Sequence, residues 1–187
     1  MTILLAGILL WFSTHLFKRV APGWRDALID RFGLGTIKLI VTALSFISLT
    51  LIIVGFKTTA LVAIYDPPAW GNYVNFPMMF GAVVLFGMGS SRGRLHTWLR
   101  HPMLTGVIVW ALAHLLVNGD NASLVLFPAM LVWALAEIFA INRRSAAWDR
   151  PEPGPAIHDL RLIVISLVVF AVIAVIHGLV GPSPFAG

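Results

Sequence analysis

Charged residues are scarce in this chain. Only 11% of its 187 residues are Asp, Glu, Lys or Arg, 59% are hydrophobic, and the mean hydropathy is +0.91. A soluble domain carries about 25% charged residues, so this composition excludes one. Cysteine is absent, which excludes disulfides, thiolate metal ligands, iron–sulfur clusters and covalently attached c-type haem. The sequence also lacks a P-loop, a GxGxxG motif and zinc-type spacings.

The sequence contains several long runs of apolar residues. Several approach the ~20 residues that a helix needs to cross the hydrocarbon core of a bilayer. The runs are continuous rather than alternating, which favours helices over strands. We therefore predict an all-α, polytopic membrane helix bundle that forms a single domain over residues 1–187. Its six transmembrane helices are predicted at residues 2–17, 36–56, 77–90, 103–118, 122–142 and 160–180.

The distribution of basic residues predicts the orientation in the membrane. Three loops on one side of the predicted bundle hold 12 of the 13 Lys and Arg residues, and the other side holds only Lys57. Basic loops stay in the cytoplasm, so both termini are predicted outside it, in the periplasm. The net charge of +5 therefore indicates membrane orientation and not nucleic-acid binding, and the lipid bilayer is the expected partner.

Ionisable residues inside these helices are candidates for function because they are costly in lipid. The four are His15, His114, Glu137 and His177. Neutral imidazoles in apolar surroundings suit b-type haem, whose iron accepts two axial histidines. They do not suit zinc hydrolysis, which usually needs three ligands and a nearby carboxylate. The alternative is structural, with each histidine bonding a carbonyl group of a neighbouring helix.

Around His114, an i, i+4 stripe runs along the predicted helix 103–118. Its members are Gly106, Trp110, His114 and Asn118. Gly106 leaves room for a neighbouring helix or a flat ligand. Asn118 is predicted to hydrogen-bond the imidazole of His114 and to fix its tautomer.

The segment RLHTWLRHPMLTG (94–106) places polar residues at the entrance of the same helix. Pro102 fits the first helical turn and keeps His101 out of helical geometry. Arg100 and His101 then form a collar, in which Arg100 can bind a phosphate or a propionate or simply anchor the membrane boundary. Glu137 is predicted to lie level with the collar and to pair with His101 or an arginine.

Three segments resemble the NnrU family of bacterial membrane proteins. LHTWLRHPMLTGVIVWALAHLLVNGDNASLVLFPAMLVWAL resembles the core of the family, FSTHLFKR its N-terminal histidine segment, and FGLGTIKLIVTALSFISLTLIIVGF its second helix. The resemblance covers about residues 1–144, with 160–180 as an extra C-terminal helix. It implies a multi-pass protein of the bacterial inner membrane that is linked to nitrite and nitric oxide metabolism in denitrification.

The NnrU family is similar to plant zeta-carotene isomerase, a membrane enzyme that binds haem b. This similarity implies haem b here, with His15 and His114 as iron ligands, and isomerase-like or redox chemistry on an apolar small molecule or nitric oxide. The predicted depths of the residues also allow other pairs, His15 with His101 and His114 with His177. Two further functions stay open: a non-catalytic membrane partner or assembly factor, and a methyltransferase that holds S-adenosylmethionine at Arg100, His101 and Glu137.

Overall fold

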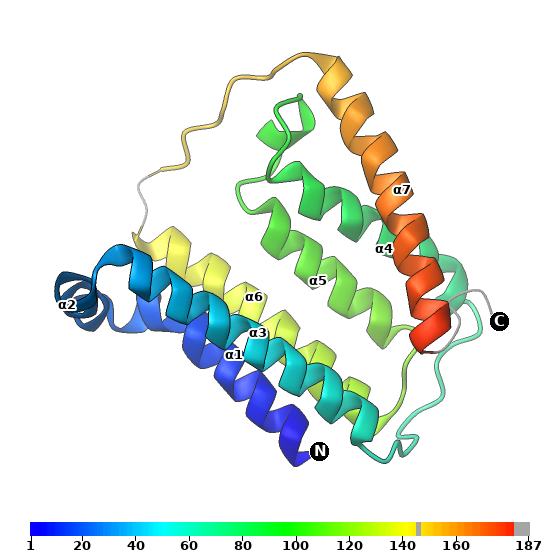
Figure 1. Cartoon of the computed structure of the whole chain (residues 1–187). Helices are drawn as coiled ribbons and strands as arrows, with labels where there is room; N and C mark the ends of the chain where they lie inside the picture. The colour runs from blue at the N-terminus through cyan, green and yellow to red at the C-terminus, as the bar shows by residue number, and fades with distance from the viewer. Residues whose placement is uncertain (145–146, 182–187) are drawn as a thin grey trace. The chain divides into compact units, whose positions relative to one another are not determined.

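The computed structural model describes residues 1–144 and 147–181, and every regular element in those residues is helical. An isolated antiparallel bridge joins Ala63 and Asp120. The prediction of an all-α fold is therefore confirmed for the described residues. Figure 1 shows their helices in chain order: α1 (Thr2–Val20), α2 (Pro22–Phe32), α3 (Leu34–Thr58), α4 (Gly71–Met88), η1 (Leu95–Thr97, a 3-10 helix), α5 (Pro102–Leu115), α6 (Asn121–Arg144) and α7 (Ala156–Val180).

Within residues 1–144 and 147–181, four helices are long and apolar enough to cross a membrane, namely α1, α3, α6 and α7, and α5 is a shorter apolar helix. Helix α7 shows this character most clearly, because its buried residues are only Leu162, Ser166 and Ala174. Large hydrophobic side chains such as Leu167 and Leu179 are exposed instead. Exposed apolar surface on this scale is stable only against hydrocarbon, so the chain is a membrane protein. The six-span count and the orientation of the termini stay predictions.

Helix α2 lies in a segment that the sequence reading assigned to a loop. Pro22 is at the start of this helix, where its missing N–H costs nothing. Gly33 follows the helix with a φ of 82°, a conformation that favours glycine. None of the α2 residues is buried, and Trp24 is strongly exposed.

The chain divides into two compact units. Unit 1 contains residues 1–66 and 119–129, and unit 2 contains residues 67–118 and 130–187. Helix α6 begins in unit 1 and continues in unit 2.

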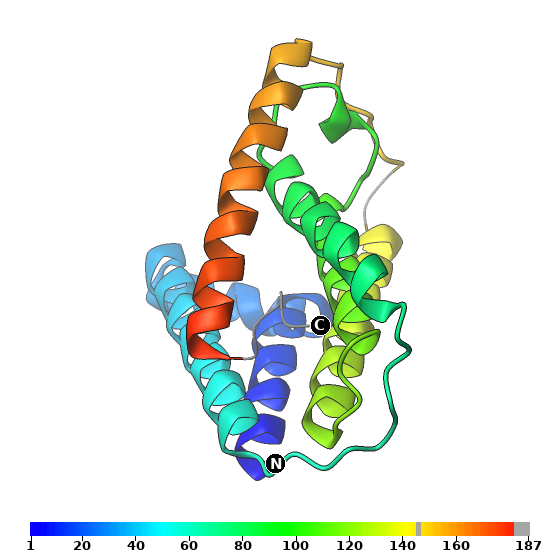
Figure 2. The same ribbon diagram turned by 90° about the vertical axis from the view of Figure 1, so that its right-hand side faces the viewer.

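In unit 1, α1 and α3 lie side by side (Figure 1, Figure 2). Glycines bring the two backbones together: a Cβ atom at Gly7 would lie 2.7 Å from the backbone nitrogen of Ile52, and one at Gly55 would overlap the backbone of Leu4. Small residues at helix contacts are the usual means of close packing in membranes.

In unit 2, α4 packs against both α5 and α7. The side-chain amide of Asn75 on α4 donates a hydrogen bond to the carbonyl oxygen of Ala113 on α5 (2.7 Å). At the other contact, a Cβ atom at Gly87 would lie 2.7 Å from Cδ1 of Leu162 on α7. The first of these contacts positions α5, which carries three of the predicted site residues, Gly106, Trp110 and His114.

Candidate functional site

His15 is held by the tryptophan one turn earlier on α1. Its Nδ1 atom lies 2.9 Å from the carbonyl oxygen of Trp11. The two rings are stacked, with centroids 4.1 Å apart and planes 26° apart. The Trp-x-x-x-His spacing therefore lets one helix provide both a hydrogen-bond acceptor and a stacked ring for the imidazole.

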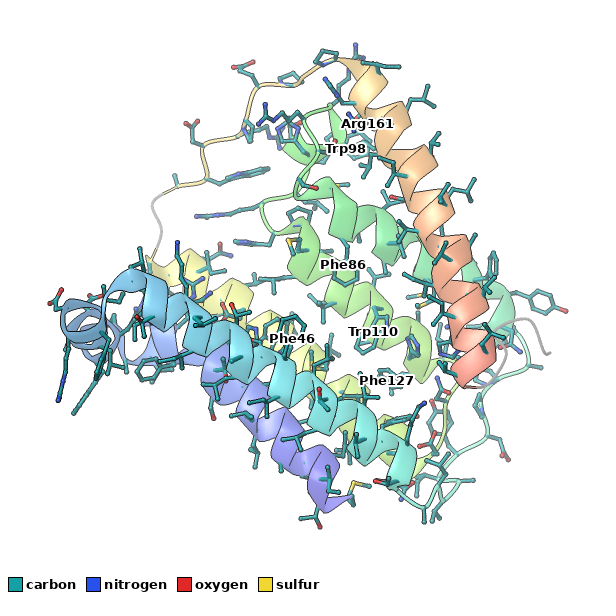
Figure 3. The ribbon with its side chains drawn as sticks, in the orientation of Figure 1. Phe46, Phe86, Trp98, Trp110, Phe127 and Arg161 are labelled. Atoms are coloured by element: carbon teal, nitrogen blue, oxygen red, sulfur yellow. The ribbon has the colours of Figure 1, made fainter. Side chains whose placement is uncertain are left out.

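His114 has the same support on α5. Its Nδ1 atom lies 2.9 Å from the carbonyl oxygen of Trp110, and the ring centroids of the two residues are 5.0 Å apart. Figure 3 labels Trp110 on this helix. The side-chain amide of Asn118 donates a hydrogen bond to the backbone carbonyl of His114 (2.8 Å), and its predicted hydrogen bond to the imidazole stays a prediction. The orientation of the His114 ring is fixed by the hydrogen bond from its Nδ1 to the carbonyl oxygen of Trp110.

These two contacts determine which ring nitrogen can bind a metal. A carbonyl oxygen only accepts hydrogen bonds, so Nδ1 must carry the proton in His15 and in His114. In a neutral imidazole, Nε2 then holds the lone pair. Histidines that ligate metals almost always donate their other N–H to a carbonyl or carboxylate in this way. Both residues thus have the chemistry of axial ligands.

The two histidines belong to different units, His15 to unit 1 and His114 to unit 2. Within unit 2, His114 of α5 and His177 of α7 interact electrostatically. The pairing of His114 with His177, which predicted depth favours, stays a prediction. No group of three or more His, Asp or Glu side chains in residues 1–144 and 147–181 is arranged to hold a metal ion. Haem requires no such group, since the porphyrin itself supplies four ligands and the protein only the axial ones.

Gly106 is buried and lies against α4. A Cβ atom at this position would lie 3.2 Å from the carbonyl oxygen of Ala82 and 3.3 Å from Cβ of Leu85. The close approach that glycine allows is therefore made by a neighbouring helix and not by a flat ligand.

The collar at the start of α5 has the predicted backbone. Pro102 lies in the first turn, and His101 precedes it with φ −128° and ψ 58°, outside helical geometry. The imidazole of His101 donates from Nε2 to the side-chain oxygen of Asn142 on α6 (2.8 Å). Arg100 is half-buried and Glu137 is 4% exposed. The sequence reading missed Asn142, and the pairing of Glu137 with His101 stays a prediction.

A second feature that the sequence reading missed is the anchoring of the loop before the collar. The carboxylate of Asp159 on α7 accepts hydrogen bonds from the backbone N–H groups of Arg94 (2.9 Å) and Leu95 (3.0 Å). Gly93 makes this contact possible, since a Cβ atom on Gly93 would overlap the Asp159 carboxylate. The predicted helices 122–142 and 160–180 leave Asp159 in the connection between them.

The chain matches the NnrU protein family over residues 3–184. The chain belongs to the NnrU family. The match includes α7 as well as α1 to α6, so Asp159 and His177 lie in the part that is common to the NnrU family. No curated protein and no solved structure matches the chain.

Proposed function

We propose that this NnrU-family membrane protein binds haem b and that His114 is one axial ligand of its iron. The observation that supports the proposal is the fixed tautomer of His114. The carbonyl oxygen of Trp110 accepts a hydrogen bond from its Nδ1–H at 2.9 Å, which places the lone pair of the neutral imidazole on Nε2, the nitrogen that would bind iron. An imidazole in a largely apolar helix has few other reasons to be oriented so completely.

The surroundings of His114 also fit a porphyrin. Helix α5 is apolar over all its 14 residues except Thr105 and His114, and apolar walls exclude water from a haem group. Trp110 contributes a flat ring beside the imidazole. When bound, haem b supplies an iron that changes oxidation state and binds small neutral ligands such as nitric oxide. The residues of the chain orient the ligand, hold its Nδ1 proton and keep the site dry.

The second axial position has two candidates. His177 belongs to the same unit as His114 and interacts with it electrostatically. His15 belongs to the other unit, but it has the same Trp-x-x-x-His support as His114. Either histidine would give the iron two histidine ligands. Single substitutions of His177 and of His15 distinguish the two assignments.

The biological role that we propose follows from family membership. NnrU-family membership and a haem site inside the membrane fit a multi-pass protein of the bacterial inner membrane that acts in nitrite and nitric oxide metabolism. The same site also fits redox or isomerisation chemistry on an apolar molecule, since only apolar or small neutral substrates reach iron at this depth.

Single-histidine variants test the proposal. His114→Ala, His177→Ala and His15→Ala are purified after expression in haem-replete cells, and bound haem per protein is measured as the pyridine haemochrome. We expect His114→Ala to lose haem, because the alanine side chain has no lone pair to bind the iron. Of the other two, the variant that changes the six-coordinate spectrum identifies the second ligand.

The matched control is His96→Ala. His96 also donates from Nδ1 to a carbonyl group, that of Gly93 at 2.7 Å, but it lies in the loop before α5. This variant should retain full haem. If His114→Ala retains haem and six-coordinate iron while remaining folded, His114 is not the ligand. If none of the proteins contains haem, the non-catalytic partner becomes the better account.

A further inference from the structure

A groove of about 530 Å³ lies between α4 and α7 in unit 2. Its volume is typical of a site for a small organic molecule. It shares no residue with the histidine site on α5. One end of the groove is polar, and the rest is apolar except for Ser166. The groove therefore fits a molecule that has a polar head and an apolar tail.

The polar end is positively charged. It is lined by Ser90, Ser91, Arg92, His158 and Arg161. Neither arginine forms an ion pair with a carboxylate among residues 1–144 and 147–181. Arg161 lies close to the N-terminal end of α7 (Figure 3).

The nearest acidic residue in sequence does not neutralise this end. The carboxylate of Asp159 is bound to the backbone N–H groups of Arg94 and Leu95 and does not line the groove. Ser91 accepts a hydrogen bond from the N–H of Gly93 (3.3 Å), so its own O–H can still donate. Two guanidinium groups and a hydroxyl donor form a suitable binding site for a phosphate.

The apolar part extends from this end along both helices. It is lined by Val83 and Phe86 of α4 and by Leu162, Ile165, Val169 and Ile173 of α7. From Arg161 to Ile173 the groove follows α7 for about 18 Å, at 1.5 Å per residue. Half of the hydrocarbon core of a bilayer is about 15 Å thick. The groove is therefore as long as one leaflet is deep.

We propose that this groove binds an acidic membrane phospholipid. The phosphate of its head group lies between Arg92 and Arg161, and one acyl chain lies along α4 and α7 toward Ile173. The charge of the polar end selects an anionic lipid over a zwitterionic one. The length of the apolar part selects a lipid over free phosphate, which would leave the groove empty.

The test compares lipids that differ only in head group. The purified full-length protein in detergent is titrated with phosphatidylglycerol or with phosphatidylcholine of the same acyl chains, and with inorganic phosphate. Bound lipid is counted by native mass spectrometry, and the thermal unfolding midpoint is followed in parallel. We expect phosphatidylglycerol to bind and to raise the midpoint more than phosphatidylcholine, and inorganic phosphate to do neither.

Two variants locate the site. The double variant Arg92→Gln/Arg161→Gln should bind phosphatidylglycerol about tenfold more weakly or worse, since each basic group contributes to the attraction. Ile173→Trp should weaken binding of long-chain phosphatidylglycerol and leave the dihexanoyl form unaffected, because it fills only the far end. All three positions are exposed, so these proteins should fold.

The matched control is Arg143→Gln/Arg150→Gln, which removes the same charge from two arginines outside the groove. Each lies over an aromatic ring, Arg143 over Phe139 and Arg150 over Trp148. This control should bind phosphatidylglycerol as the unmodified protein does. Equal weakening in both double variants would mean attraction by overall charge and would overturn the proposal. Equal protection by inorganic phosphate would overturn it as well, because the acyl chain would then contribute nothing.

Discussion

At the scale of single residues, the orientation of the two imidazoles is a local consequence of sequence. In His15 and His114, Nδ1 reaches the carbonyl oxygen of the tryptophan one helical turn earlier, at the same distance of 2.9 Å. An i, i+4 spacing places these groups on one helix face. The Trp-x-x-x-His pattern was visible in the sequence, and the tautomer that it imposes is a result of the structure.

This tautomer can be measured directly. In the haem-free protein labelled with ¹⁵N-histidine, we expect Nδ1 of His114 to be protonated and Nε2 to be unprotonated at neutral pH, because a carbonyl group can only accept the proton of Nδ1. Solid-state ¹⁵N spectra distinguish the two nitrogens, with His114→Gln for assignment. A protonated Nε2 beside a bare Nδ1 would contradict the geometry and remove the main support for His114 as a ligand.

Other contacts of the site could not be predicted from sequence. Asn142 is 41 residues from His101, and Asp159 is 65 residues from Arg94. No spacing pattern connects such distant positions, because they meet only after the helices have packed. Both contacts link helices of unit 2, and both fix the ends of the segment 94–101.

At the scale of elements, hydrophobic runs identified α1 and α3 to α7 but placed some ends wrongly. Helix α4 begins at Gly71, six residues before its predicted start, because Pro77 lies inside the helix and not at its beginning. Proline is tolerated within membrane helices. Helix α2 was missed because it has no apolar run, although Pro22 and Gly33 bracket it as start and stop signals.

The contact between α1 and α3 gives a prediction at this scale. Gly55→Ala should destabilise the protein by about 1–3 kcal/mol, since the new methyl group would overlap the backbone of Leu4. Backbone atoms cannot move aside as a flexible side chain can. The measurement is reversible unfolding in mixed micelles with increasing denaturing detergent, followed by circular dichroism.

Gly35→Ala is the matched control on the same helix. A Cβ atom at Gly35 would meet nothing within 4 Å, so this change should leave stability unaltered or raise it by up to about 1 kcal/mol through helix propensity. If the two variants unfold alike, the close approach of α1 and α3 is not present in the membrane.

At the scale of the whole molecule, the distribution of basic residues predicts the topology, and the lack of cysteine makes it simple to test. Single cysteines are introduced as Asp66→Cys, between α3 and α4, and Glu152→Cys, between α6 and α7. We expect a membrane-impermeant maleimide to label Asp66→Cys in intact cells with an accessible periplasm, and Glu152→Cys only after lysis. The unmodified chain has no cysteine and gives the background.

The reverse labelling pattern would place the basic loops outside the cytoplasm and contradict the predicted orientation. Labelling of both positions from the same side would contradict the number of spans between them. The reverse pattern would also move the charged end of the groove between α4 and α7 away from the cytoplasmic side, while the haem proposal would stand unchanged.

The central claim is that this NnrU-family protein carries haem b inside the membrane. The most direct test is the absorption spectrum of the detergent-purified, full-length protein from haem-replete cells, first oxidised and then reduced with dithionite. We predict a Soret band together with sharp α and β bands on reduction, the signature of six-coordinate haem b with two histidine ligands. A folded protein with no Soret band, also after titration with added haemin, would contradict the claim.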